Sequence, residues 1–207
     1  MMTRDRRVGY RNGKFLARDV MMSTFVSRRL IVTSVAALAV LLSACGGAAS
    51  APQSNAQKAN VLLNAGLAAH QAGRTAEAAT DYSKAIALEP QNKWAHYNLG
   101  LIEQNNGQFA AAEADYRAVV TTDPNFIGAL YNLAILRTAS APAEAADLYR
   151  RAIAVAPNMG SAHLNLGFLL IGMGQKAQGQ AELDKAVSIE PTLAQRIPKP
   201  AVASAKK

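Results

Sequence analysis

The sequence predicts an all-α fold in which four helix-turn-helix units stack into a solenoid. Asparagine recurs at Asn64, Asn98, Asn132 and Asn165, at steps of 34, 34 and 33 residues. A tyrosine or leucine follows each asparagine by 17 or 18 residues, and a proline follows by 25 or 26. A fixed period of this length is typical of stacked repeats and not of a catalytic globule. These two further sets of landmarks are Tyr82, Tyr116, Tyr149 and Leu183, then Pro90, Pro124, Pro157 and Pro191.

Each unit is predicted to contain two helices with one apolar stripe each. In the first unit, small and apolar residues recur at helical spacing in both halves. We expect small residues where the two helices cross, with the aromatic residue filling the gap beyond them. A single pair cannot cover its own apolar face, so four units must stack into one core. The paired small positions are Gly66, Gly100, Ala134 and Gly167 in the first helices and Ala78, Ala112, Ala145 and Gly179 in the second.

Turn residues separate the helices within and between the units. Gly73, Gly107 and Gly174 stand where a helix end favours a left-handed residue. The third unit lacks this glycine, and we expect Ser140 to cap its second helix with Pro142 in the first turn. The prolines end each unit because proline cannot continue a helix. The predicted units span 59–92, 93–126, 127–159 and 160–193, within a domain over 58–192, followed by a basic mobile tail over 193–207.

The sequence around the four asparagines resembles the tetratricopeptide repeat family. The matching segments are Leu62-Leu63-Asn64-Ala65-Gly66, His96-Tyr97-Asn98-Leu99-Gly100, Leu130-Tyr131-Asn132-Leu133-Ala134 and His163-Leu164-Asn165-Leu166-Gly167. The resemblance implies a right-handed solenoid whose first helices line a concave surface that binds a protein or peptide. By this analogy the groove residues are Asn64, Asn98, Asn132, Asn165, Trp94, Tyr97, Tyr131, Leu101, Ile135 and Phe168, with Leu63, Leu67 and Leu164 beside them.

The groove asparagines have two interpretations. An amide carries both a donor and an acceptor, so a ladder of four can pair with the backbone of an extended peptide. Alternatively, the asparagines hydrogen-bond neighbouring helices and support the stack, and both roles can hold together. Trp94, Tyr97 and Tyr131 are the expected anchors for a partner, because such rings dominate interface energies, although they too can belong to the inter-repeat core.

The resemblance to the family also indicates which kind of peptide the groove would bind. Some members hold a partner's C-terminal carboxylate with lysine and arginine on these helices. At the five corresponding positions of this sequence, only Asn98 is the residue type that those members have. An internal or apolar peptide segment is therefore expected in place of an acidic tail. The five positions are Leu63, Leu67, Asn98, Gly128 and Asn132.

The beginning of the chain is predicted to be a cleaved lipoprotein signal peptide over residues 21–44. Arg28 and Arg29 precede an apolar run over 30–42, whose thirteen residues are too few to span a bilayer. The run into Cys45 resembles a bacterial lipobox, which implies acylation at Cys45 and cleavage before it. Residues 45–57 are then a flexible tether with a reach of about 20 Å. Residues 1–20 fit a mis-called start or an extended leader.

Charge and the anchor together favour the cell envelope. Residues 1–44 carry eight Lys or Arg and two Asp or Glu, whereas the rest carries fourteen and twelve, so the basic balance belongs to the leader. We therefore expect no nucleic-acid partner. Gly46 after the cysteine permits sorting to the periplasmic face of an outer membrane. In a one-membrane species the anchor would hold the exterior of the plasma membrane.

No pattern predicts an enzyme, a cofactor or a metal site. The sequence lacks the short catalytic and phosphate-binding motifs, and the histidines at equivalent places in two first helices do not converge. Acidic residues of the second helices are expected on a solvated face: Glu77, Asp81, Glu113, Asp115, Glu144 and Asp147. The predicted function is a membrane-anchored adaptor. The alternative is a structural lipoprotein that forms homo-oligomers through a weakly capped fourth unit.

Overall fold

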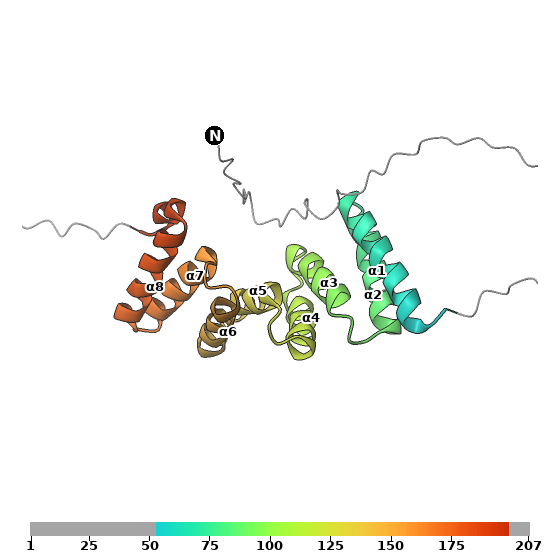
Figure 1. Ribbon diagram of the computed structural model, residues 1–207, viewed down its shortest axis with the longest axis horizontal. Coiled ribbons are helices and arrows are strands. Elements are labelled where there is room, and N and C mark those ends of the chain that lie inside the picture. The colour runs from blue at the N-terminus through green and yellow to red at the C-terminus, as the bar shows by residue number, and fades with distance from the viewer. Residues whose placement is uncertain (1–52, 199–207) are drawn as a thin grey trace, which may run out of the picture. The chain divides into compact units, whose positions relative to one another are not determined.

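The computed structural model describes residues 53–198, where all regular structure is helical (Figure 1). Eight α-helices form four successive pairs, and each pair packs on the next. This confirms the predicted α-solenoid. The helices are α1 Asn55–Gln71, α2 Thr75–Leu88, α3 Lys93–Asn105, α4 Phe109–Thr122, α5 Ile127–Arg137, α6 Pro142–Val155, α7 Gly160–Gly172 and α8 Lys176–Ile189, followed by the 3₁₀ helix η1 Pro191–Arg196.

Local sequence explains where the helices begin. Ser54 and Gln57 form a reciprocal capping box at α1, and the Asn92 side chain accepts from the backbone of Ala95 at α3. The predicted Ser140 cap of α6 is wrong, because Pro142 takes the first helical position and so makes Ala141 the N-cap. The turn is closed instead by the backbone, with the Ala141 N–H donating to the Arg137 carbonyl at 2.8 Å.

Three turns within the pairs use glycine in the left-handed region, as predicted. Gly73, Gly107 and Gly174 have φ of 77°, 75° and 82°. A side chain would be strained in this conformation. The shortened third turn avoids it, because its helix ends with Thr138 in right-handed geometry.

The two helices of the first and second pairs approach closely where a glycine faces a tyrosine ring. A Cβ added to Gly66 would lie 2.6 Å from the Tyr82 ring, and one on Gly100 would lie 2.9 Å from the Tyr116 ring. Both tyrosine rings are fully buried. In these two pairs the aromatic ring lies directly against the glycine, and not only in the gap beyond the predicted contact between small residues.

The fourth pair ends in a closed and largely polar surface. Leu193 of η1 is buried and packs with Leu164, Leu183 and Ala186. The exposed residues of α8 are polar, charged or alanine. The prediction of a mobile tail from residue 193 is therefore wrong for residues 193–196, because they belong to η1 and cover the apolar end of the stack.

Several predictions concern segments outside the described residues. Cys45, the signal peptide and the tail beyond residue 198 belong to them. Within residues 53–198, no helix is both long enough and apolar enough to cross a membrane.

Candidate interaction surface

One stripe on each first helix combines an asparagine amide with apolar side chains. Residues spaced by four and three positions share a helix face. We call the resulting surface the first-helix face. It contains no charged residue, and three of its side chains, Trp94, Ile135 and Phe168, are 52%, 37% and 36% exposed. The face comprises Asn60, Asn64 and Leu67 of α1, Trp94, Asn98 and Leu101 of α3, Gly128, Asn132 and Ile135 of α5, and Ser161, Asn165 and Phe168 of α7.

The residues that immediately precede the asparagines point further into the stack. Leu63 is 9% exposed and Leu164 is fully buried, so their expected place on the groove surface is wrong. A step of one residue turns a helix by about 100°, which is enough to move a side chain from the face to the core. Tyr97 and Tyr131 occupy the same position, are half-buried, and pack against the central core.

Two of the four asparagines bind the neighbouring repeat. The Asn165 side-chain amide donates to the Tyr131 hydroxyl at 3.0 Å, and that of Asn132 donates to the Tyr116 hydroxyl at 3.5 Å. Asn98 instead donates to the Trp94 carbonyl of its own helix at 2.7 Å, and Asn64 is exposed. The stacking role is therefore present at Asn132 and Asn165. A role in peptide binding stays a prediction for all four.

The first repeat junction lacks the corresponding amide–tyrosine bond. The Tyr116 hydroxyl donates to Gln104 at 2.9 Å, but the buried Tyr82 hydroxyl has no hydrogen-bond partner among residues 53–198. Burial raises the pKa of Tyr82 to about 12. Because Asn98 turns towards Trp94, its amide is presented at the surface and does not join the first two repeats.

Trp94 lies at the edge of an aromatic cluster. The sequence predicted Trp94 and Tyr97 as exposed anchors but not the third ring, Phe126. The Trp94 ring meets that of Phe126 edge-on, with centroids 5.0 Å apart, and the Tyr97 ring lies 4.8 Å from Phe126. Phe126 stands where Asn92 caps the preceding repeat, and it provides no side-chain cap. A phenylalanine at a position where a helix cap is expected was the feature of the sequence that could have indicated this packing role. Lys93 lies over both rings while its ammonium is 2.7 Å from Asp123.

The second helices carry an ion-pair network where a solvated face was expected. Arg117 pairs with Glu113 and Glu144 at 3.0 and 2.8 Å, and Arg137 pairs with the same two carboxylates at 3.2 and 2.8 Å. Hydrogen bonds from Arg117, and then from Arg137, lower the pKa of Glu144. These bonds join α4, α5 and α6. The expectation of free solvation is therefore wrong for Glu113 and Glu144.

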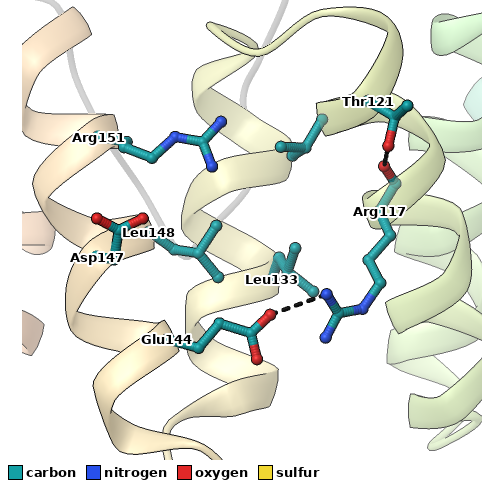
Figure 2. Close-up of a pocket in the computed structure, with 8 residues that line it drawn as sticks. Arg117, Thr121, Leu133, Glu144, Asp147, Leu148 and Arg151 are labelled. Carbon is teal, nitrogen blue, oxygen red and sulfur yellow. Dashed lines mark hydrogen bonds and ion pairs between the residues drawn. The ribbon is translucent and has the colours of Figure 1, made fainter.

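A small cavity of about 220 Å³ lies beside this network (Figure 2). Arg117 and Thr121 face it from α4, whereas Glu144, Asp147 and Arg151 face it from α6, with Leu133 between the helices. The cavity is smaller than the 300–1,000 Å³ typical of cofactor sites, and its arginines are balanced by carboxylates. It gives no indication of a cofactor.

Two histidines, His96 and His163, each link the turn that precedes their helix to the second helix of the same pair. His96 lies between Asp115 at 2.8 Å and the Pro90 carbonyl at 3.0 Å, and His163 lies between Glu182 at 2.6 Å and the Pro157 carbonyl at 3.0 Å. The expectation of a solvated Asp115 is therefore wrong, since its side chain is 14% exposed. Within the described residues, no group of three or more His, Cys, Asp or Glu is arranged to hold a metal.

The fold and this surface define a helical-repeat scaffold. Three overlapping family models match the described region: one described as TPR repeat over residues 66–107, and two described as tetratricopeptide repeat over 97–159 and 136–197. The repeat region belongs to the tetratricopeptide repeat family. No catalytic family is indicated, and proteins of this family act in general as scaffolds without enzymatic activity. A comparison with curated proteins finds no significant match.

Solved structures share the fold at low sequence identity. A crystal structure of MamA has a TM-score of 0.59 at 20% identity, covering 66% of this chain and 81% of that one. A MamA fragment from Desulfovibrio magneticus RS-1 gives 0.57 at 21% identity, with coverage of 65% and 76%. The first TPR of Spaghetti (RPAP3), bound to the HSP90 peptide SRMEEVD, gives 0.54 at 25% identity, with coverage of 58% and 97%.

Proposed function

We propose that this protein is a membrane-anchored adaptor of the bacterial cell envelope that binds a protein partner on its first-helix face. The observation that carries the proposal is the uncharged surface on which Trp94, Ile135 and Phe168 stand exposed beside the amide ladder. A surface without charge that carries exposed aromatic and aliphatic side chains is typical of the centre of a protein-binding site. A related repeat domain bound to a peptide supports the same use of the fold.

The composition of the face favours a neutral, apolar segment of the partner. Lys93 stands beside Trp94, but Asp123 neutralises it. An acidic C-terminal tail would find no unpaired cation on the face, since none of its residues is charged. The asparagine amides bind backbone groups whatever the side chains of the partner are, and Trp94 supplies the main apolar contact.

The anchor is proposed from the sequence around Cys45. Two or more acyl chains at this cysteine would hold the protein stably at a lipid surface, whereas one chain would hold it weakly. The proposed tether would keep the repeats clear of the headgroups, and it is shorter than the predicted segment 45–57 because α1 already begins at Asn55. Because Gly46 follows the cysteine, an outer-membrane location is proposed for a two-membrane species, with a role in pilus, secretion or envelope assembly.

The alternative of a self-associating structural lipoprotein receives less support. It uses the fourth repeat as an apolar docking edge, but η1 and the polar residues of α8 cover that end. Light scattering over a range of concentrations distinguishes the two. The adaptor predicts a constant monomer mass, whereas self-association predicts a mass that rises with concentration.

Two experiments test the proposal directly. Cells are labelled with radioactive palmitate while they express the wild-type chain or Cys45→Ser, and only the wild type is expected to incorporate label and sediment with membranes. The lipidated protein is then used to capture partners from envelope extracts, with Trp94→Ala as the control. Label in the Cys45→Ser chain contradicts the anchor, and equal capture by Trp94→Ala contradicts the binding face.

A further inference from the structure

His96 lies between two groups that accept hydrogen bonds. Its Nδ1 is 2.8 Å from a carboxylate oxygen of Asp115 on α4, and its Nε2 is 3.0 Å from the Pro90 carbonyl in the turn before α3. A neutral imidazole has one N–H, so it can satisfy only one of these acceptors. The protonated ring satisfies both. The bond to Asp115 is the main cause that raises the pKa of His96.

A second carboxyl group completes the cluster. Glu103, two turns further along α3, lies near enough to Asp115 for the charges of the two carboxyl groups to interact. As ionised groups both could only accept, which would leave Oε2 of Glu103 and Oδ2 of Asp115 buried with no partner. One proton between the two carboxyls removes this conflict. Burial, and then the charge of Asp115, raise the pKa of Glu103 to about 7.

The cluster is isolated from other charges. His96 and Glu103 come from α3 and Asp115 from α4, and the charges of both carboxyls also act on the Tyr116 hydroxyl of α4. The closing turn contributes only the Pro90 carbonyl. Among residues 53–198, no lysine or arginine acts on His96 or Glu103. The protonation of the cluster therefore depends mainly on His96, Glu103 and Asp115 themselves.

The fourth repeat provides a natural comparison. His163 makes the same two contacts, to Glu182 of α8 and to the Pro157 carbonyl. At the position of Glu103, however, the fourth repeat has Leu170, which is buried in the core. The second repeat therefore has the additional carboxyl, and the fourth does not.

We propose that His96, Asp115 and Glu103 make the α3–α4 hairpin a pH-responsive element, closed by a shared proton at mildly acidic pH and loosened as that proton leaves. The direction follows from linkage. The folded state binds a proton at Glu103 more tightly than the unfolded chain does, so its stabilisation is full below about pH 4.5 and is lost as pH rises through about 7. The raised pKa of His96 acts in the same direction.

This element would also reach the first-helix face. Trp94, Asn98 and Leu101 are on α3, so loosening α3 would weaken partner binding at alkaline pH. That consequence rests on the proposed function. The response of the hairpin itself does not, and it can be measured without any partner.

Hydrogen exchange of the full chain tests the proposal. Protection of α3–α4 and of α7–α8 is measured at pH 5.5 and pH 8.0, after correction for intrinsic exchange rates. We expect protection of α3–α4 to fall by about tenfold or more between these values. Protection of α7–α8 should change much less. Equal changes in both hairpins would overturn the proposal.

Two variants make the test specific to Glu103. Glu103→Leu copies the fourth repeat, and Glu103→Gln keeps a neutral donor for Asp115, so both should weaken the pH response of α3–α4. If either folded variant retains the full response, the proposal is wrong. In the wild-type chain, carbon-13 NMR of the Glu103 carboxyl provides a further readout, and titration in the ordinary range near pH 4.5 would also overturn it.

Discussion

Asn165 and Tyr131 join two consecutive first helices. The amide of Asn165 on α7 donates to the hydroxyl of Tyr131 on α5 at 3.0 Å. The asparagine position that is predicted to bind a peptide therefore also supports the stack. The bond uses the Asn165 side-chain nitrogen and fixes the orientation of the amide. Its oxygen can then accept a hydrogen bond, as recognition of a peptide backbone requires.

Asn165→Ala is expected to destabilise the protein by about 1 kcal/mol relative to Asn64→Ala. Both substitutions gain helix propensity, but only Asn165 loses a bond to the neighbouring repeat. Urea denaturation followed by circular dichroism measures the difference. Equal free energies of unfolding for the two variants would show that the Asn165–Tyr131 bond contributes nothing to the stack.

Trp94→Ala is expected to weaken partner binding tenfold or more, at a cost to stability of less than about 1 kcal/mol. The side chain is 52% exposed and stands on the first-helix face. Phe109→Ala is the matched control, since Phe109 is 57% exposed but begins α4, a second helix. Titration calorimetry with the captured partner compares them. Loss of affinity in the Phe109 variant alone would place the binding surface on the second helices.

Gly100→Ala is expected to destabilise the protein by about 1–3 kcal/mol through overpacking. The added methyl would lie 2.9 Å from the Tyr116 ring, which is fully buried and has little room to move. At Gly172 nothing lies within 4 Å of an added Cβ, so Gly172→Ala should be neutral or stabilising. Thermal unfolding distinguishes the pair. A Gly100→Ala variant as stable as the wild type would contradict the close helix crossing.

Glu144→Gln is expected to reduce the loss of stability on the acid side. Arg117 and then Arg137 lower the pKa of Glu144, so its contribution is present above about pH 4.5 and is lost as pH falls through its folded value. The wild-type midpoint for urea should therefore fall more steeply from pH 5 to pH 3 than that of the variant. Parallel curves would show that the network adds no pH-dependent stability. This direction is opposite to that of Glu103.

Periodicity predicted the elements of the fold but not all of their rotations. The steps between Asn64, Asn98 and Asn132 located the repeats, and the recurrence of Gly66 and Tyr82 predicted a close helix crossing, although not that the two residues touch. Leu63 shows the limit, because the spacing did not distinguish its buried position from the exposed position of Asn64. One residue turns the helix by about 100°. Only the packing against the neighbouring pair determines which of the two side chains is buried.

Contacts between repeats were the part that the sequence did not predict. Glu113 and Arg137 are 24 residues apart and lie in consecutive helix pairs, so their pairing depends on how the pairs stack. His96 and Asp115, 19 residues apart, lie in one pair, and their contact depends on how α3 packs against α4. Phe126 was missed for a similar reason, because its contact with Trp94 joins the start of α5 to the start of α3. The side chains of the second helices appeared to be solvated only when each helix was considered alone.

Photo-crosslinking from defined positions tests the binding face most directly. A photoreactive amino acid replaces Ile135 on the first-helix face or the exposed Ala114 on α4, in otherwise identical lipidated protein. The proposed adaptor predicts one discrete crosslinked product from position 135, absent from position 114 and reduced by Trp94→Ala. A product that forms equally from both positions, or from position 114 alone, would contradict it.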